Sequence, residues 1–512
     1  MGNEPSRSLF GLPKRDFGDG EQGAARYAAN LLALLSVTLT ISALSGGLLN
    51  VSFPVVVRHF DASATAASWL ILSAMLASTT LIVMWGRLAD MFGRIPIFMG
   101  GLALMTLTSI LAGLSPSIGF LIVVRVVQAG GSAMLLAVMA AMLTVSTPTE
   151  KLSRYMGIYM SALASASLAG PPLGALLAET VGWRWLFWFQ APFGVVLIVW
   201  AAMTLRPMPA VGERGRMDIA GVLLLGGTLT GLIVALSRLQ TKGITNPLVL
   251  IGFAAFLACL PAFVLVETRR ASPLVDLRLF RKKSVAASNA AMLFGNMARN
   301  AVVLIAGLYF QAVDGNSTLE AAFKVLPLPL ATTAAGFFMG RISRWGTQQA
   351  IATWASAVSA VGILVLMPAF SQGMAYPVMF AGLFVAGFGG GVFMPANTTA
   401  ILQEVPRERL GVVNAVRMML MFAGGVIATA LSLALITSAV APGLRSAVFA
   451  GTVSHVSGGA VASLRTGYLR AILVLNLLNV IGIIAAGIAQ RAHRRGLGEP
   501  GGPHEVPPAP SP

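Results

Sequence analysis

Charged residues and cysteines are scarce in this sequence. Charged side chains make up 10% of the 512 residues, whereas a water-soluble domain carries about 25%. The single cysteine, Cys259, excludes a disulfide framework and a cysteine-based metal site. The four histidines have no other metal ligands beside them, and no catalytic constellation is present in the sequence. We therefore expect neither a cofactor nor a metal, and the lack of a catalytic constellation argues against an enzyme.

Long apolar runs are what the sequence has instead. Apolar side chains make up 56% of the chain, and its mean hydropathy is +0.81. A helix that spans a bilayer needs about 20 apolar residues. Runs of this kind lie near residues 28–50, 64–84, 96–115, 117–141, 156–178, 185–205, 219–237, 247–266, 286–311, 321–340, 349–370, 375–399, 411–436 and 468–490. They do not show the short alternating pattern of a membrane β-barrel, so the sequence predicts fourteen transmembrane helices.

Basic residues outnumber acidic ones by 35 to 18, which gives a formal net charge of +17. They are scattered between the apolar runs rather than gathered on one domain, which argues against nucleic-acid binding. Most of them fall in the loops on the side that also holds both chain ends. Because basic loops stay in the cytoplasm, we expect a multi-pass protein of the cell membrane (plasma or bacterial inner membrane) with both termini cytoplasmic.

The sequence also contains an internal repeat. Gly86–Arg94, after the second run, is echoed by Gly340–Gly346 after the tenth, and glycine-rich stretches of the fourth and fifth runs recur in the twelfth and thirteenth. An offset of eight helices implies two six-helix halves separated by an inserted pair. Repeated halves are typical of transporters in which one half rocks against the other. The predicted units are an N-terminal tail (1–27), an N-terminal six-helix bundle (28–205), two inserted helices with a cytoplasmic linker (206–283), a C-terminal six-helix bundle (284–490) and a disordered C-terminal tail (491–512).

Five stretches carry a resemblance to a known family. Gly86–Arg94 resembles that family's G-x-L-a-D-x-x-G-R loop between helices two and three. The other stretches are Arg125–Ala133, Gly170–Gly174, Trp183–Gly194 and Pro273–Arg281. Through them the chain resembles the major facilitator superfamily, specifically its fourteen-helix drug:proton antiporter branch. The resemblance implies an all-α integral membrane protein with the major facilitator fold, in which two six-helix bundles are joined by two inserted transmembrane helices.

The glycines in the loop after the second run can be explained by sterics, independently of the resemblance. Gly86 and Gly93 allow a tight turn between two helices where a side chain would collide with a neighbour. The resemblance implies that Asp90 and Arg94 form a cytoplasmic latch that opens when a transporter changes state. The alternative is that Asp90 is an ordinary solvated carboxylate.

Arg125 lies in the fourth run, about eight residues and therefore roughly 12 Å from its outer edge. Burial of a charge at this depth in the membrane costs free energy, so we expect such a residue to have a function. The resemblance links Arg125, together with Gln128, to proton transfer. The alternative is a structural role in which Arg125 binds backbone carbonyls of the first helix.

The fifth run carries the antiporter signature Gly170, Pro171, Pro172 and Gly174. The prolines deny the helix two backbone donors, and the glycines permit close packing against a neighbouring helix. We therefore expect a kink at a moving interface, and the alternative is a kink that stays static.

None of the 18 acidic residues falls in the middle of an apolar run. Members of the branch that export cationic drugs carry an acid in helix one, and Ser45 occupies the corresponding place here. A buried carboxylate attracts a lipophilic cation or carries a coupling proton. The sequence therefore contains no evident residue for binding a cationic drug or for carrying a coupling proton.

Arginines occupy the middle of the C-terminal half instead. Arg299, flanked by Asn296 and Asn300, lies near the centre of the ninth run, and Arg417 lies near Asn414 in the thirteenth. Two unpaired guanidiniums that face one cavity would favour an anionic substrate. The alternative is that each is neutralised by helix carbonyls or reaches toward the membrane interface. Further candidates for the substrate cavity are Ser45, Asn50, Tyr159 and Gln311.

The sequence predicts a secondary active transporter that exports amphipathic organic compounds, such as a drug, an antibiotic or a toxic metabolite. Proton antiport, export and alternating access are what the resemblance implies. Expected partners are a small-molecule substrate, protons and the lipid bilayer, with no nucleic acid and no obligate protein partner. Two alternatives stay open: a transporter of anionic metabolites or lipids with weak or no proton coupling, and a membrane scaffold or sensor that does not transport.

Overall fold

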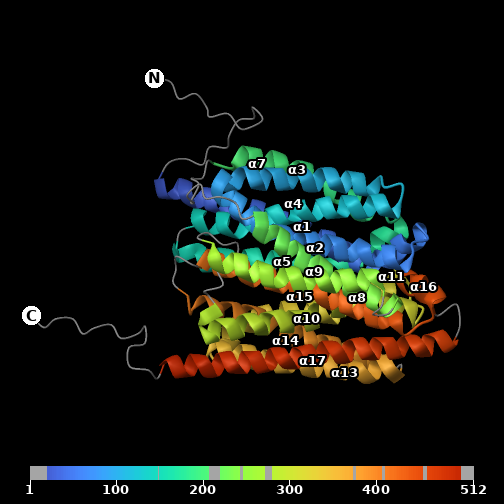
Figure 1. Ribbon diagram of the computed structural model, residues 1–512. Coiled ribbons are helices and arrows are strands. Elements are labelled where there is room, and N and C mark those ends of the chain that lie inside the picture. Colours follow the sequence, from blue (N-terminus) through green and yellow to red (C-terminus); the bar gives the residue numbers. More distant parts are fainter. Residues whose placement is uncertain are drawn as a thin grey trace, which may run out of the picture.

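The computed structural model describes residues 20–147, 149–206, 219–242, 246–270, 280–372, 376–405, 410–453 and 458–497. These residues form α-helices, short 3-10 segments and turns, and none of them forms a strand. The long helices run side by side and build one elongated bundle (Figure 1). The predicted all-α fold class is confirmed.

The N-terminal part of the bundle contains seven helices. They are α1 (Gly20–His59), α2 (Ala64–Phe92), α3 (Arg94–Gly113), α4 (Ile118–Ser146), α5 (Thr149–Thr180), α6 (Trp185–Trp188) and α7 (Gln190–Thr204). The short α6 and α7 together occupy the sixth predicted run. Helix α1 packs chiefly against α5, whereas α4 packs against α2 and α3.

Two helices, α8 (Ile219–Lys242) and α9 (Pro247–Arg269), pack against each other, and α8 also contacts α2 and α15. The C-terminal part consists of α10 (Lys283–Ala312), α11 (Thr318–Val325), α12 (Pro327–Ile342), α13 (Gln348–Gln372), α14 (Tyr376–Leu402), α15 (Leu410–Ser438), η3 (Pro442–Leu444), α16 (Arg445–Ala450) and α17 (Gly458–Leu497). Helices α11 and α12 share the tenth predicted run. The second of them starts at Pro327, because proline fits the first position of a helix and lacks the N–H that would continue the preceding one.

Among the described residues, twelve helical segments are long and apolar enough to cross a membrane. A helix occupies each of the fourteen predicted positions, but α5 and α8 do not belong to these twelve. Of α8, the apolar helix within the residues whose side chains are described covers Ala220–Leu236. The predicted count of fourteen transmembrane helices is therefore not confirmed.

The first and last helices are longer than their apolar runs. Helix α1 begins at Gly20, inside the predicted tail 1–27, and α17 ends at Leu497, inside the predicted tail 491–512. The last turn of α17 carries Arg494 and Arg495, and positive charge stabilises the C-terminus of a helix. Apolarity marks the part of a helix that lies in lipid, so it does not show where the helix itself begins and ends.

The start of α1 and the end of α17 lie at the same end of the bundle, on the left in Figure 1. We call this the terminal end, and we call the opposite end, where α11 and α16 lie, the far end. The shared position of the two helix ends agrees with an even number of spans. That the terminal end faces the cytoplasm stays a prediction from the basic loops.

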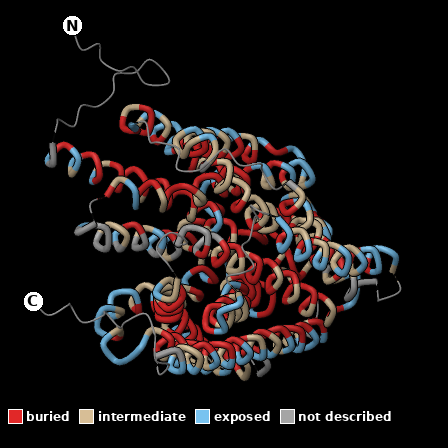
Figure 2. The backbone as a smooth tube through the Cα atoms, turned by 60° about the vertical axis from the view of Figure 1, so that its left-hand side comes forward, coloured by how far each residue is buried: buried red, intermediate tan, exposed pale blue. Residues whose placement is uncertain are grey.

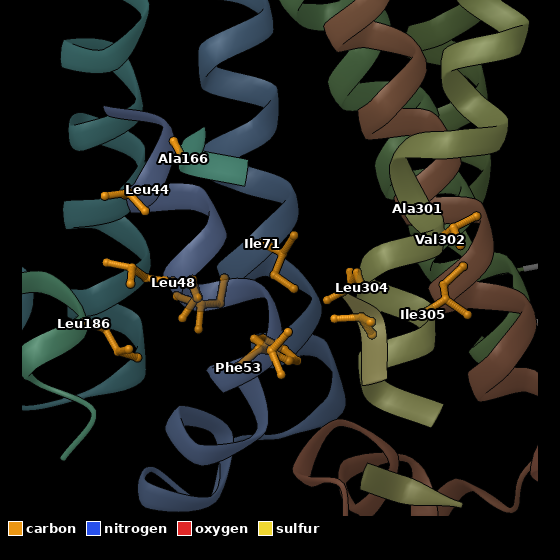
Figure 3. Close-up of a cluster of buried hydrophobic side chains, with 14 of the residues drawn as sticks. Leu44, Leu48, Phe53, Ile71, Ala166, Leu186, Ala301, Val302, Leu304 and Ile305 are labelled. Atoms are coloured by element: carbon orange, nitrogen blue, oxygen red, sulfur yellow. The ribbon is translucent and has the colours of Figure 1, made fainter. Parts of the chain in front are cut away.

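The segments that face the interior of the bundle consist largely of buried residues (Figure 2). One apolar cluster joins the two parts, with Leu48 and Phe53 from α1, Ile71 from α2, and Leu304 and Ile305 from α10 (Figure 3). Lipid is as apolar as these side chains, so close packing rather than removal from water stabilises their association in a membrane.

Candidate functional site

Arg299 lies in the middle of α10, with its guanidinium directed at α14. Its two terminal nitrogens are buried and have no hydrogen-bond partner. The guanidinium carbon lies 4.4 Å from the centre of the Phe393 ring. Gly390 of α14 makes room for the side chain, because a Cβ at this position would lie 2.6 Å from Cδ of Arg299. A cation–π contact contributes about 0.5–2 kcal/mol, less than the several kcal/mol that desolvation of a charge costs.

No carboxylate of the described residues lies near the middle of the membrane-length helices. The acidic side chains described are Asp61, Glu179, Glu267, Asp314, Glu320 and Glu404, and each lies in a turn or near a helix end. The absence of an acid in the middle of the apolar runs, noted in the sequence, thus holds for this part of the chain. The central charge among the described residues is that of arginine.

The other predicted polar residues of the C-terminal half are engaged by protein groups. The Nδ2 of Asn296 donates a hydrogen bond of 2.6 Å to the carbonyl of Met421 and so connects α10 to α15. Arg417 is buried and has an interaction partner. The prediction of an unpaired guanidinium is therefore wrong for Arg417. The side chain of Asn414 lies outside the described residues.

Arg125 belongs to a chain of hydrogen bonds inside the N-terminal part. Its Nη1 donates to Oε1 of Gln128 at 2.8 Å, and Nε2 of Gln128 donates to Oγ of Ser109 at 2.8 Å. The guanidinium also lies 5.9 Å from the centre of the Phe187 ring. The structure thus brings together the two residues predicted for proton coupling and adds Ser109 of α3, to which no motif pointed. The contacts described for Arg125 are to α4 and α6 and do not support the alternative tie to α1.

The signature of the fifth run lies where α5 touches α1. A Cβ at Gly170 would lie 2.9 Å from Cα of Gly47, and a Cβ at Gly174 would overlap the carbonyl oxygen of Leu48. The two backbones are therefore in direct contact. Helix α5 continues through Pro171 and Pro172 without an interruption. The predicted close packing is present, whereas the kink and its movement stay predictions.

The turn at the predicted latch contains fewer residues than the motif suggested. Gly93 has φ +93° and forms the junction between α2 and α3. Gly86 lies inside α2, and a Cβ there would meet nothing within 4 Å. The prediction that Gly86 contributes to the turn is wrong, because the helix continues past it. Arg94 donates to the carbonyl of Ala141 in α4 at 3.3 Å. The side chain of Asp90 lies outside the described residues, so its latch contact stays a prediction.

We expect Gly93→Ala to destabilise the protein and Gly86→Ala to leave it as stable or slightly more stable. A backbone conformation that only glycine adopts easily costs an alanine about 1–3 kcal/mol, whereas alanine is favoured over glycine by about 1 kcal/mol inside a helix. Thermal unfolding of the purified variants in detergent measures both effects. Equal melting temperatures for the two variants would contradict the assignment of the turn to Gly93.

The remaining cavity candidates differ in their surroundings. Ser45 and Tyr159 are buried, and Asn50 is half-buried. Gln311 has a defined role, because its Nε2 donates to the carbonyl of Val51 in α1 at 2.9 Å and its Oε1 accepts from Oγ1 of Thr318 at 3.4 Å. Gln311 therefore connects the N-terminal and C-terminal parts and is fully occupied by protein partners.

Two further hydrogen bonds join the parts at the far end. Nη1 of Arg58 in α1 donates to the carbonyl of Ala450 in α16 at 2.7 Å, and the backbone N–H of Leu319 in α11 donates to Glu179 of α5 at 2.8 Å. The sequence analysis missed both bonds. Each has a backbone group as one partner, and a backbone group leaves no signal in the side-chain pattern.

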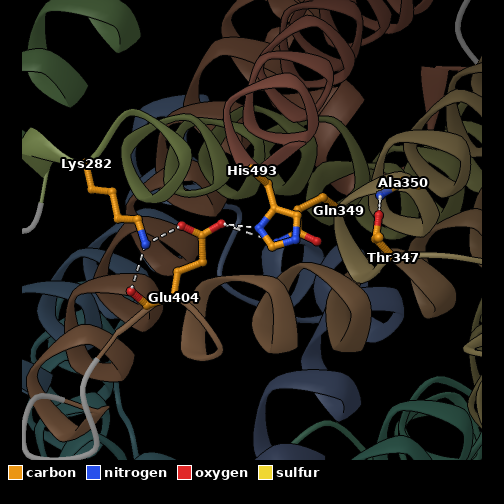
Figure 4. A network of polar contacts seen from close by, with 6 residues as sticks. All are labelled: Lys282, Thr347, Gln349, Ala350, Glu404 and His493. Carbon is orange, nitrogen blue, oxygen red and sulfur yellow. Dashed lines mark hydrogen bonds and ion pairs between the residues drawn. The ribbon is translucent and has the colours of Figure 1, made fainter. Parts of the chain in front are cut away.

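A polar cluster at the terminal end was also missed (Figure 4). Glu404, just after α14, lies 2.9 Å from Nζ of Lys282 and 2.9 Å from Nδ1 of His493 at the end of α17. Burial raises the pKa of the Glu404 carboxyl, but hydrogen bonds from Ser284, Lys282 and His493 outweigh it and hold the pKa below its usual value. The ionised carboxylate therefore holds the ends of α10, α14 and α17 together. The separation of 89 residues between Glu404 and His493 hides this contact in the sequence.

Comparison with known proteins gives a consistent result. The family model of the Major Facilitator Superfamily matches residues 35–429. The multidrug resistance protein B homolog of Mycobacterium tuberculosis (strain ATCC 25618 / H37Rv) is 30% identical over 396 residues, which are 74% of this chain and 71% of that protein. The tetracenomycin C resistance and export protein of Streptomyces glaucescens is 27% identical over 404 residues, 78% of this chain and 74% of that protein.

The fold has a solved counterpart in a bacterial homologue of the human lysosomal transporter Spinster, crystallised in an inward-facing and unoccupied conformation. The superposition covers 93% of this chain and 99% of that chain, with a TM-score of 0.65 and 16% sequence identity. At this identity the likeness shows the arrangement of the helices.

Proposed function

Because the chain belongs to the Major Facilitator Superfamily, we propose that it is a secondary active transporter that exports amphipathic organic compounds such as drugs, antibiotics or toxic metabolites. The observation that carries this proposal is the similarity to a multidrug resistance protein over 74% of the chain. The relative from Streptomyces glaucescens, a resistance and export protein, supports the same direction of transport.

Contacts between the two parts support alternating access as the mechanism. The hydrogen bonds of Gln311, Arg58 and Leu319 join the parts at the far end. If the terminal end is cytoplasmic, as the basic loops predict, these bonds close the transporter toward the outside. Outward release of a substrate then requires that they break while contacts form at the terminal end.

Proton antiport is the finer part of the proposal. It rests on the antiporter signature at Gly170–Gly174 and on the resemblance of Arg125 and Gln128 to a proton-transfer motif. Within the described residues no mid-helix carboxylate is available to carry the proton. The hydrogen-bonded side chains of Arg125, Gln128 and Ser109 are the polar path that we propose for proton transfer in the N-terminal part.

We expect deletion of the gene to sensitise its host to some members of a panel of toxic amphipathic compounds, and restoration of the gene to reverse this. Everted membrane vesicles that contain the protein should accumulate the same compounds. Accumulation should stop when an ionophore collapses the pH gradient if protons are exchanged. Wild-type sensitivity to the whole panel, together with vesicles that accumulate none of it, would refute the export proposal. Accumulation that ignores the ionophore would refute only the proton coupling.

A further inference from the structure

Arg299 is a buried cation to which the described protein supplies no counter-charge. It lies roughly 20 Å from either end of α10, at about 1.5 Å per helical residue. The described carboxylates lie in turns or near helix ends, beyond the reach of an arginine side chain at this depth. Arginine keeps its proton in proteins, so the charge has to be compensated from elsewhere.

The surroundings of Arg299 leave its hydrogen-bonding edge free. Nη1 and Nη2 have no partner, and the contact with Phe393 uses the face of the guanidinium plane rather than its N–H groups. Gly295 and Gly390 flank the side chain without side chains of their own. The guanidinium is therefore positioned by packing while its donors remain unused.

Arg299 lies in the interior of the bundle, beside an exposed residue. Helix α10 is packed by α1, α14, α15 and α17, so it is an interior helix. Nevertheless Arg299 is only half-buried as a whole residue, and Asn300 beside it is exposed. Nη1 and Nη2 of Arg299 are themselves buried, so a solute reaches them only when the helices around them separate.

We propose that Arg299 is the substrate-recognition residue for organic acids: the exported compounds carry a carboxylate that binds Nη1 and Nη2 through two parallel hydrogen bonds. Bidentate pairing of this kind is the preferred geometry between guanidinium and carboxylate. The Phe393 ring beside the guanidinium provides an apolar surface for the rest of the compound. This assignment rests on the proposed transport function and specifies its substrate class.

One consequence concerns the driving force. The substrate anion itself supplies the charge that compensates Arg299, so no carboxylate of the protein is required for binding. Export of an anion moves negative charge out of the cell, and a membrane potential that is negative inside drives this movement. Transport of the acid should therefore respond to the potential as well as to any pH gradient.

The test uses the full-length protein, purified and reconstituted in liposomes, and a panel of fluorescent aromatic carboxylic acids with their uncharged primary amides. We expect the wild type to bind the acid at least about tenfold more tightly than the matched amide, a factor that corresponds to one bidentate charged pair. Arg299→Gln should bring the two affinities to within about twofold of each other and leave amide binding unchanged. Arg491→Gln removes an exposed guanidinium at the end of α17 and should keep the wild-type preference.

Two more variants separate recognition from folding. Arg299→Lys keeps the charge but loses the bidentate geometry, so it should retain only part of the preference for the acid. Gly390→Ala keeps the guanidinium but places a methyl group against its Cδ, and it should weaken acid binding more than amide binding. These variants give an answer even if Arg299→Gln does not fold.

Flux measurements complete the test. Valinomycin with a potassium gradient sets the membrane potential, and acid flux should rise when the potential favours anion movement, whereas amide flux should not change. An undiminished preference for acids in Arg299→Gln, or wild-type transport of amides with no preference for acids, would overturn the assignment while leaving the transport function intact. If the wild type neither binds nor moves any member of the panel or the toxic compounds above, the proposed function itself fails.

Discussion

Gly174→Ala should prevent α1 and α5 from packing and should abolish transport. A methyl group at this position would overlap the carbonyl oxygen of Leu48, and the neighbouring contact between Gly170 and Gly47 is nearly as close. Both obstacles are backbone, so no side chain can rotate away and the helices have to separate. Excess atoms in a packed core cost typically about 1–3 kcal/mol, and we expect the upper part of this range or more here. Thermal unfolding in detergent and transport by reconstituted protein measure the effect.

Gly336→Ala is the matched control for this substitution. Gly336 lies inside α12, is exposed, and would present its new methyl group to open space. The control should therefore unfold at or slightly above the wild-type temperature, because alanine favours the helix. A Gly174→Ala protein as stable as this control would show that α1 and α5 are not in backbone contact.

Removal of two far-end bonds should shift the transporter toward a state that is open at the far end. The double variant Arg58→Gln, Gln311→Leu deletes the side-chain donors to Ala450 and Val51. A neutral hydrogen bond contributes about 0.5–1.5 kcal/mol and a charged one about 1.5–3 kcal/mol. Because about 1.4 kcal/mol is a factor of ten, the ratio of closed to open molecules at the far end should fall by roughly 30- to 1,500-fold.

A single reporter cysteine detects this shift. Cys259, the one cysteine of the chain, is first replaced in Cys259→Ser, and Gly46→Cys then introduces a thiol at an exposed position in the middle of α1. An impermeant maleimide added on the far side should label the double variant much faster than the parent. Arg184→Gln is the control, because the guanidinium of Arg184 stacks on Trp183 of the same part at 4.7 Å. Equal labelling rates in all three proteins would contradict far-end closure by these bonds.

Sequence patterns were informative wherever a property depends on residues close together in the chain. Hydropathy located the helices, and the lack of a central acid was visible from the positions of Asp and Glu alone. The glycines of the fifth run predicted close helix packing, which the Gly170–Gly47 contact shows. The same reasoning could not separate Gly86 from Gly93, because both are compatible with a turn and only the backbone angle distinguishes them.

Partners that lie far apart in the sequence could not be predicted. Arg299 and Arg417 looked alike as intramembrane arginines, yet the terminal nitrogens of Arg299 have no hydrogen-bond partner while Arg417 has an interaction partner. Gln311 was a general cavity candidate, and its bond to Val51, 260 residues away, makes it a connection between the two parts. Such differences depend on which helix faces which, and no local pattern contains that information.

The sequence by itself determined that this chain is a helical protein embedded in a membrane, because composition and hydropathy are properties of the chain before it folds. It also determined that the charge available in the middle of the apolar runs is positive. Only the tertiary structure decided which of these charges is compensated and at which end the two parts are joined. Both depend on the approach of helices that are distant along the chain, and the energy of a buried charge or hydrogen bond is set by those neighbours.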